Sequence, residues 1–253
     1  MLAKLFKNLR TQNRSALIVH ITCGYPSFDF CEKLIERVCA SGADIIELGI
    51  PFSDPIADGT ALQQTSRLAL DNGATLERSL DMVARLRQKG VNTPFVMRSY
   101  LNPIFQLGVE NTAKKCADAQ LNGIYVVDLP IEQADEITTD FAPRNIDFIT
   151  LVAPTTPIER VSKISQTASG FLYYVADDEK LADVRKASTL PIAAAFEISE
   201  PEVAKKVALV SDAVIIAGKV AEITQNAIVN ENEDVAIERV GEFVKLIAQQ
   251  MAR

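Results

Sequence analysis

Short apolar runs alternate along this chain with longer stretches in which apolar residues recur every three or four positions. The short runs are rich in β-branched residues, which is typical of buried strands, and the longer stretches are typical of amphipathic helices. The runs predict strands at residues 16–22, 45–48, 94–100, 123–127, 148–152, 171–175, 191–195 and 213–217. The longer stretches predict helices at residues 28–40, 76–88, 109–119, 158–167, 201–207 and 235–251, with Ser27 and Thr75 as N-caps of the first two.

The repeated order of strand and then helix requires a parallel sheet with right-handed crossovers. Eight such units close on themselves, and 253 residues is a usual length for that fold. We therefore predict an α/β protein with a single (β/α)8 TIM barrel as its one domain, residues 1–253. An open doubly wound sheet is the competing fold, but no GxGxxG motif follows the first strand. An extra N-terminal helix is expected to cover the bottom of the barrel with one apolar stripe of Leu2, Leu5, Phe6 and Leu9.

The composition narrows the kinds of partner. The formal net charge of -7 disfavours a nucleic acid or an anionic membrane. No apolar stretch approaches the roughly 20 residues of a membrane-spanning helix, and the first residues are too short an apolar run for a secretory signal, so a cytoplasmic protein is expected. The four cysteines lack metal-site spacing and His20 is the single histidine. We therefore predict no metal site and expect the cysteines to be buried thiols.

Active sites of (β/α)8 barrels lie at the carboxyl ends of the strands. Polar and aromatic residues at or just beyond these ends should therefore face one pocket: His20, Glu47, Tyr100, Asp128, Tyr173, Phe196 and residues 217–218. Glu47 and Asp58 bracket the loop ELGIPFSDPIADG, which can place a general acid and a general base on opposite sides of one small cleft. A strand-end Glu and a capping Asp that both face water are the simpler alternative.

The same loop, residues 47–59, closely resembles the signature of the tryptophan synthase α subunit family. The likeness continues through Gln63, the string YLNP at 100–103, VDLP at 127–130, APTT at 153–156 and GFLY at 170–173, so it spans nearly the whole chain. The resemblance implies a lyase that cleaves indole-3-glycerol phosphate to indole and glyceraldehyde 3-phosphate in tryptophan biosynthesis. It also implies that this chain carries no cofactor of its own.

The resemblance implies roles for individual residues as well. Glu47 matches the family's proton-transferring glutamate, Asp58 matches the aspartate that engages the indole nitrogen, and Asp128 is expected to be structural. The remaining matched positions bind substrate: Leu62, Tyr100, Tyr173, Phe196, Gly218 and Lys219. The loop that contains Pro51, Asp54 and Pro55 faces a β subunit in the family, which implies an allosteric αββα assembly with pyridoxal phosphate in the β partner.

The chain departs from the family pattern where the substrate phosphate would bind. The stretch at 174–180 lacks the family's long lid, which we interpret as a deletion. Glu197 replaces a glycine and puts a carboxylate where the phosphate should bind, while Lys219 introduces a cation that could either bind phosphate or face solvent. Phosphate binding is therefore expected to be impaired.

Two further departures concern the indole end of the pocket. His20 and Arg98 occupy positions that are apolar in the family, and Arg98 is expected either to pair with Glu47 or Asp128 or to meet a polar ligand.

Two alternative functions follow from the departures. One is a catalytically weak or inactive α-like subunit that activates a β subunit, and the other is a barrel repurposed for an indole-like or carboxylated ligand that uses His20, Arg98 and Glu197.

Overall fold

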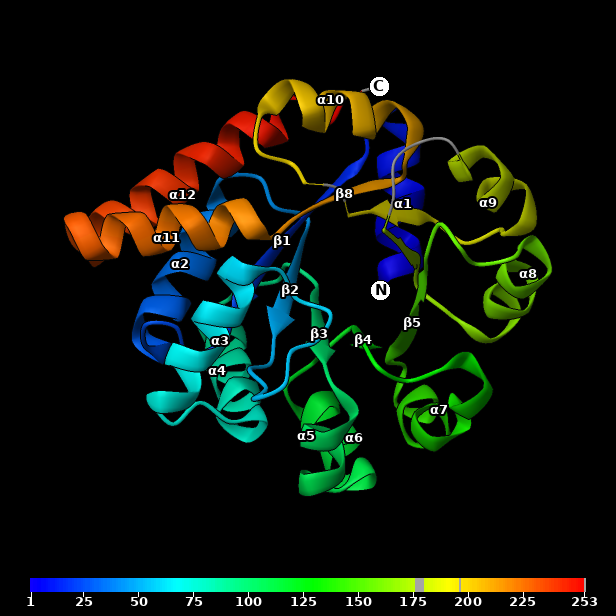
Figure 1. Ribbon diagram of the computed structural model, residues 1–253, viewed down its shortest axis with the longest axis horizontal. Coiled ribbons are helices and arrows are strands. Elements are labelled where there is room, and N and C mark those ends of the chain that lie inside the picture. Colours follow the sequence, from blue (N-terminus) through cyan, green and yellow to red (C-terminus); the bar gives the residue numbers. More distant parts are fainter. Residues whose placement is uncertain (176–179, 196, 253) are drawn as a thin grey trace.

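The computed structural model describes residues 1–175, 180–195 and 197–252. Eight parallel strands form a closed barrel in which each strand pairs with its neighbours in chain order and β8 pairs with β1 (Figure 1). The strands are β1 Ala16–Thr22, β2 Ile45–Gly49, β3 Phe95–Ser99, β4 Gly123–Val126, β5 Asp147–Val152, β6 Leu172–Tyr174, β7 Ile192–Ala194 and β8 Ala213–Ile216. The predicted barrel and all eight predicted strands are confirmed, whereas the open sheet is excluded.

The helices form a ring around this barrel (Figure 1). Ser27 and Thr75 cap their helices as predicted, because their side-chain oxygens accept hydrogen bonds from the backbone N–H groups of Phe30 and Arg78, each at 3.1 Å. The predicted helices are α1 Leu2–Thr11, α2 Phe28–Ala40, α4 Leu76–Gln88, α6 Val109–Asp118, α8 Ile158–Thr167, α10 Pro201–Val210 and α12 Glu233–Ala248. The sequence patterns did not predict α3 Thr60–Asp71, α5 Leu101–Leu107, α7 Asp135–Phe141, α9 Leu181–Ala187 and α11 Gly218–Asn230.

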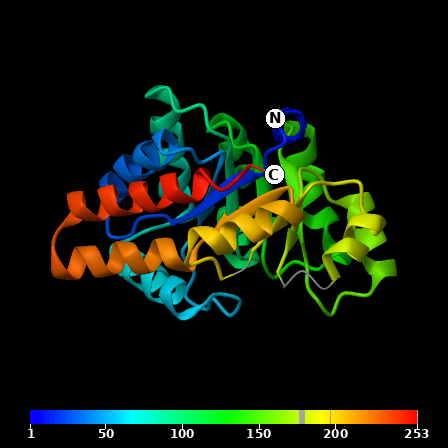
Figure 2. The same cartoon turned by 90° about the horizontal axis from the view of Figure 1, so that it is seen from above.

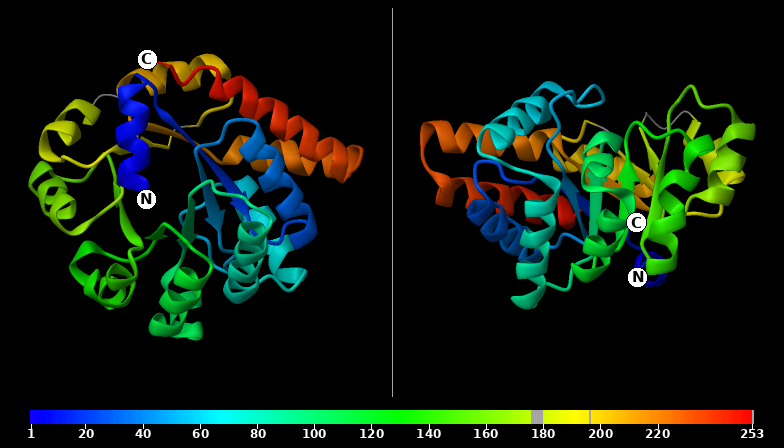
Figure 3. Two further views of the ribbon diagram at one scale, coloured as in Figure 1. Left: turned by 180° about the vertical axis from the view of Figure 1, so that it is seen from behind. Right: turned by 90° about the horizontal axis from the view of Figure 1, so that it is seen from below.

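The N-terminal helix α1 closes the bottom of the barrel, as expected. Leu2, Phe6 and Leu9 are buried against inward-facing strand residues. The ring of Phe6 meets Phe171 edge to face, with 5.8 Å between centroids. From behind, α1 crosses in front of the strands (Figure 3, left). Because this end is plugged, a ligand can enter only from the carboxyl ends of the strands.

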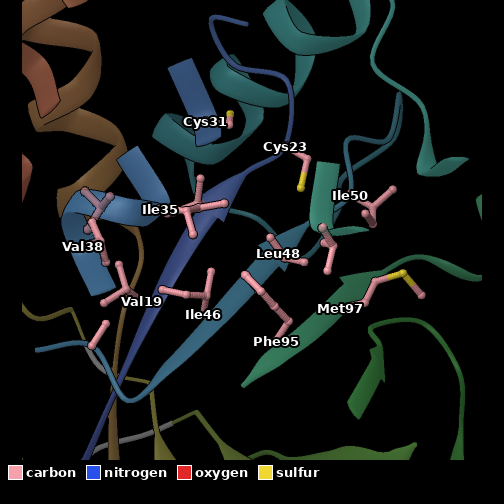
Figure 4. Close-up of a cluster of buried hydrophobic side chains, with 14 of the residues drawn as sticks. Val19, Cys23, Cys31, Ile35, Val38, Ile46, Leu48, Ile50, Phe95 and Met97 are labelled. Atoms are coloured by element: carbon pink, nitrogen blue, oxygen red, sulfur yellow. The ribbon is translucent and has the colours of Figure 1, made fainter. Parts of the chain in front are cut away.

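The outward faces of the strands pack against the helices in a second apolar layer. Between β1, β2, β3 and α2, Val19 and Ile46 lie close to Ile35 and Val38 of the helix (Figure 4). All four side chains are fully buried, and each such burial contributes about 1.5–3 kcal/mol. On one side of the barrel α11 and α12 lie side by side, and α12 also contacts α2 (Figure 2). Because such a close-packed core leaves little room for movement, it holds the strand ends, and thus the residues of the site, in fixed positions.

The four cysteines are free, with Cys23, Cys31 and Cys116 buried and Cys39 half-buried. Burial raises the pKa of Cys31 to about 12, so this thiol is unreactive at neutral pH. Among the described residues, no helix combines the length and apolarity that crossing a membrane would require.

Candidate active site

A cavity of about 350 Å³ opens at the carboxyl ends of the strands. Each strand supplies one lining side chain, which lies near the carboxyl end of the strand's inward-facing row or just beyond the strand. These residues are His20, Glu47, Arg98, Tyr125, Leu151, Tyr173, Ala195 and Ala217. Loops add Ala57, Asp58, Ala153, Pro154 and Val175, and the first turn of α3 adds Leu62. Inward-facing residues point into a barrel at every second position, so the last such residue of each strand faces the mouth. The volume suits a small organic ligand.

Glu47 and His20 form a buried pair at the floor of the cavity. They are direct neighbours in the register of β1 and β2, and Nδ1 of His20 lies 2.7 Å from Oε2 of Glu47. The side chains are 3% and 1% exposed, so neither is accessible to bulk water. The second carboxylate oxygen, Oε1 of Glu47, is buried and has no hydrogen-bond partner among the described residues. A buried carboxylate oxygen in this state is poised to accept a hydrogen from a ligand.

Asp58 faces the same cavity from the loop between β2 and α3. Nη2 of Arg98 donates to Oδ1 of Asp58 at 2.5 Å, and the two side chains are 11% and 5% exposed. Burial alone lowers the pKa of Arg98, but the negative charges of Asp58 and Glu47, together with Tyr173, more than reverse this, and the pKa is raised overall. The sequence led us to expect Glu47 or Asp128 as partner of Arg98, and that expectation is wrong. Arg98 is in register with Gly49, two residues past Glu47, so its side chain reaches the loop that follows β2.

Two tyrosines form one wall of the cavity. The rings of Tyr125 and Tyr173 stack with 4.8 Å between centroids, and the guanidinium of Arg98 lies 6.0 Å from the ring centre of Tyr125. Burial raises the pKa of both phenols above the usual range, so both stay protonated at neutral pH. A flat aromatic ligand would therefore meet an aromatic surface beside two carboxylates.

Tyr100 and Asp128 support the site from outside the cavity. The backbone N–H of Ala57 donates to the Tyr100 hydroxyl at 3.1 Å, and Phe52 stacks on the Tyr100 ring with 5.0 Å between centroids. Oδ1 of Asp128 accepts a hydrogen bond from the backbone N–H of Leu101, the first residue of α5, at 2.8 Å. Tyr100 thus holds the loop that carries Asp58, and Asp128 has the structural contact expected of it.

The described residues expected at the phosphate end, Glu197, Gly218 and Lys219, do not line the cavity, although the adjacent Ala217 does. Gly218 begins α11, and Nζ of Lys219 pairs with the Glu222 carboxylate at 2.9 Å. Glu197 is exposed between β7 and α10. The expected substrate residue Phe196, and most of the shortened stretch at 174–180, lie outside the described residues.

The cavity brings together most of the residues that the sequence singled out. Glu47, Asp58, Leu62 and Tyr173 line it, as do the altered positions His20 and Arg98. The sequence reasoning missed Tyr125, Leu151 and Pro154. Strand alternation could have found the first two, because both lie on the inward row of a predicted strand. The metal-free expectation stays a prediction, although no three potential metal ligands gather within the described parts of the chain.

The cavity at the carboxyl ends of this closed parallel barrel holds two carboxylates, a buried basic partner for each and an aromatic wall. This arrangement is typical of a (β/α)8-barrel enzyme and is suited to acid–base chemistry on a small ligand. The family model described as "Tryptophan synthase alpha chain" matches residues 6–251. The tryptophan synthase alpha chain of Marinobacter nauticus is 40% identical over 226 residues, which cover 84% of each chain. That of Geotalea uraniireducens is 37% identical over 96% of this chain and 94% of its own.

The fold agrees with these sequence matches. The crystal structure of tryptophan synthase subunit alpha from Legionella pneumophila is similar with a TM-score of 0.92 at 32% identity, covering 99% of this chain and 97% of that one. The chain belongs to the tryptophan synthase α chain family. It is an α-type subunit, and the α-type reaction is the carbon–carbon cleavage of indole-3-glycerol phosphate to indole and glyceraldehyde 3-phosphate.

Proposed function

We propose that this chain cleaves indole-3-glycerol phosphate in the cavity at the barrel mouth, with Glu47 and Asp58 as the acting pair. The observation that carries the proposal is that both carboxylates face one cavity of suitable size. The stacked pair of Tyr125 and Tyr173 offers the indole ring an aromatic surface, and Leu62 adds an apolar contact. The test is indole release from this substrate by the purified chain.

The proposed chemistry needs two proton carriers. Asp58 takes the proton of the indole N–H while Glu47, in its protonated form, delivers a proton to ring carbon C3, which gives the indolenine tautomer. The bond between C3 and the glycerol carbon then breaks as Glu47, now a carboxylate, takes the proton of the hydroxyl on that carbon. The ring nitrogen takes back the proton held by Asp58, and an aldehyde and free indole result. The electron pair of the broken bond returns to the ring, so no oxidant or reductant is needed.

The phosphate would bind at the start of α11. Ala217, which lines the cavity, is the N-cap of this helix, no side chain caps it, and its first turn holds no acidic residue. Backbone N–H groups at such a helix start favour an anion. Because Lys219 already forms an ion pair with Glu222, its ammonium group would stabilise a bound phosphate less than an unpaired cation would. Glu197 would still oppose a phosphate dianion, and we propose that binding is weakened rather than lost.

Replacing Glu197 by glycine should therefore tighten the binding of glycerol phosphate. We expect about a tenfold lower Kd, equivalent to about 1.4 kcal/mol, because one like charge is removed from the vicinity of the dianion. Isothermal calorimetry measures the affinity. Glu197→Asp is the matched control, since it retains the charge and should bind as the wild type does. Equal affinities for the glycine and aspartate variants would show that Glu197 does not face the phosphate.

We further propose a β-type subunit with pyridoxal phosphate as partner, in an αββα complex. The loop at 51–55 is the proposed contact surface for this partner. Asp54 is exposed, Pro55 is half-buried, and Pro51 is buried but lines a groove of about 420 Å³ beside α3 and α5. Allosteric activation would require that the β subunit bind the α subunit differently in its active state.

Asp54→Ala should weaken activation of a β-type subunit without unfolding the barrel. The exposed Asp54 carboxylate accepts a hydrogen bond from its neighbour Ser53 within the loop, at 2.6 Å, so removal of this side chain should change the free energy of unfolding by no more than about 0.5 kcal/mol. Activation is measured as β-subunit turnover against α-chain concentration. Asp183→Ala on α9, another exposed carboxylate, is the control. If both variants activate equally, the partner binds elsewhere.

A second candidate is an α-like subunit that activates the β partner but cleaves little or no substrate. The exposed Glu197 carboxylate near the expected phosphate end favours it. A repurposed barrel is less favoured, because His20 and Arg98, the groups it would use, are engaged by Glu47 and Asp58.

A further inference from the structure

His20 makes a direct contact with the proposed proton carrier. Its Nδ1 atom lies 2.7 Å from Oε2 of Glu47, and the two residues face each other across the register of neighbouring strands. A carboxylate oxygen only accepts, so the ring nitrogen donates. The ring thereby occupies one of the two carboxylate oxygens.

The other oxygen of Glu47 is left for the ligand. Oε1 is buried and has no hydrogen-bond partner among the described residues, while Glu47 itself lines the cavity. Rotation about the last bond of the Glu47 side chain would exchange the two oxygens or turn both away from the ligand. The bond to His20 opposes that rotation, because breaking it would leave a buried donor and a buried acceptor unpaired.

The surroundings hold the ring of His20 in place. Gly49 provides the space: a Cβ atom at this position would lie 2.5 Å from both Cε1 and Nε2 of His20. Behind the ring is a small cavity of about 20 Å³, lined in part by Thr22, Thr65 and Thr224 and large enough for about one water molecule. His20 thus lines both the small cavity and the ligand cavity.

We propose that His20 is a positioning residue for the lyase reaction. By donating to Oε2 it fixes the Glu47 carboxylate with Oε1 directed at the ligand, in the geometry that proton transfer to the indole ring requires. This inference rests on the proposed function of Glu47. The other charged or titratable groups that face the same cavity are Asp58, Arg98, Tyr125 and Tyr173. Within the described parts of the chain, His20 is the group that hydrogen-bonds to the Glu47 carboxylate.

Two substitutions separate positioning from packing. His20→Phe retains a flat ring but removes the donor, whereas His20→Asn removes most of the ring but can place an amide N–H where Nδ1 lies. We expect His20→Phe to lower kcat by about 10- to 100-fold with KM changed less than about threefold, since misplaced reacting groups slow chemistry rather than binding. We expect His20→Asn to recover most of the lost kcat. A packing role predicts the reverse order, with the phenylalanine variant the more active.

A double-mutant cycle with Gly49 tests the geometry and remains informative if one histidine variant folds poorly. Gly49→Ala should lower kcat in the wild type, because its methyl group displaces the imidazole ring. It should have much less effect in the His20→Asn background, because asparagine lacks the two ring atoms that the methyl group would meet. Thr224→Val, which alters the small cavity without touching Glu47, is the control and should leave kcat unchanged. Thermal unfolding of each variant checks that the barrel is intact.

The outcomes also separate this inference from the proposed function. If Glu47→Gln retains full turnover, the proposed function fails. If Glu47→Gln is inactive but His20→Phe has the kcat of the wild type, or if the two substitutions in the cycle are additive, the proposed function stands and the positioning role of His20 is refuted.

Discussion

Replacement of Glu47 by glutamine should lower kcat for indole formation from indole-3-glycerol phosphate by about 10² to 10⁴, the usual contribution of a positioned general acid or base. Glutamine has the shape of glutamate, and its side-chain oxygen can still accept a hydrogen bond from His20 at the present distance of 2.7 Å. The variant should therefore fold normally and retain the cavity. Only the transferable proton is lost, so the effect should appear in kcat and hardly in KM.

The control for this substitution is Glu242→Gln on the exposed face of α12, which should change neither kcat nor the thermal midpoint. Steady-state indole release gives both kinetic constants. Undiminished turnover by Glu47→Gln would remove Glu47 from the mechanism.

Replacement of Asp58 by asparagine should affect both activity and stability. Asparagine can still accept a hydrogen bond but cannot take the indole N–H proton, so kcat should fall by about 10² or more. The same change leaves Arg98, which is 11% exposed, without its ion-pair partner, and breaking a buried pair costs about 3 kcal/mol in the free energy of unfolding. Urea unfolding monitors the second effect separately from turnover.

A second substitution separates the two effects of Asp58. Arg98→Met in the Asp58→Asn background removes the unpaired cation, so we expect most of the lost stability to return while activity stays low. Recovery of turnover along with stability would mean that Asp58 only holds Arg98 and takes no part in the reaction.

The fold could be predicted from the sequence because each strand coincides with a local run of mainly apolar residues. Runs such as 16–22 and 45–48 are apolar except for His20, Thr22 and Glu47, as expected of strands whose two faces are buried, and the structure ends them within a residue of the prediction. The helix α11 was missed because its buried face consists partly of small or polar residues, Ala221, Thr224 and Ala227, which give a weak apolar period. The helix α5 was missed because it is short and has a proline in its first turn.

Most residues of the candidate site could be predicted from the sequence, but not which of them contact one another. Topology alone brings Glu47, Tyr173 and His20 to one mouth, since all three lie near the carboxyl ends of inward-facing rows of parallel strands. Which basic residue meets which carboxylate depends on register. The alignment of His20 with Glu47 and of Arg98 with Gly49 decides it, and no local pattern in the sequence encodes that alignment.

Indole release from indole-3-glycerol phosphate, measured with the purified chain alone and again with a cognate β-type subunit, tests the central claim most directly. The proposed function predicts measurable release by the chain alone, a larger rate with the partner, and loss of both in Glu47→Gln. No release under either condition, with normal activation of the β subunit, would contradict it and establish the chain as a regulatory α-like subunit.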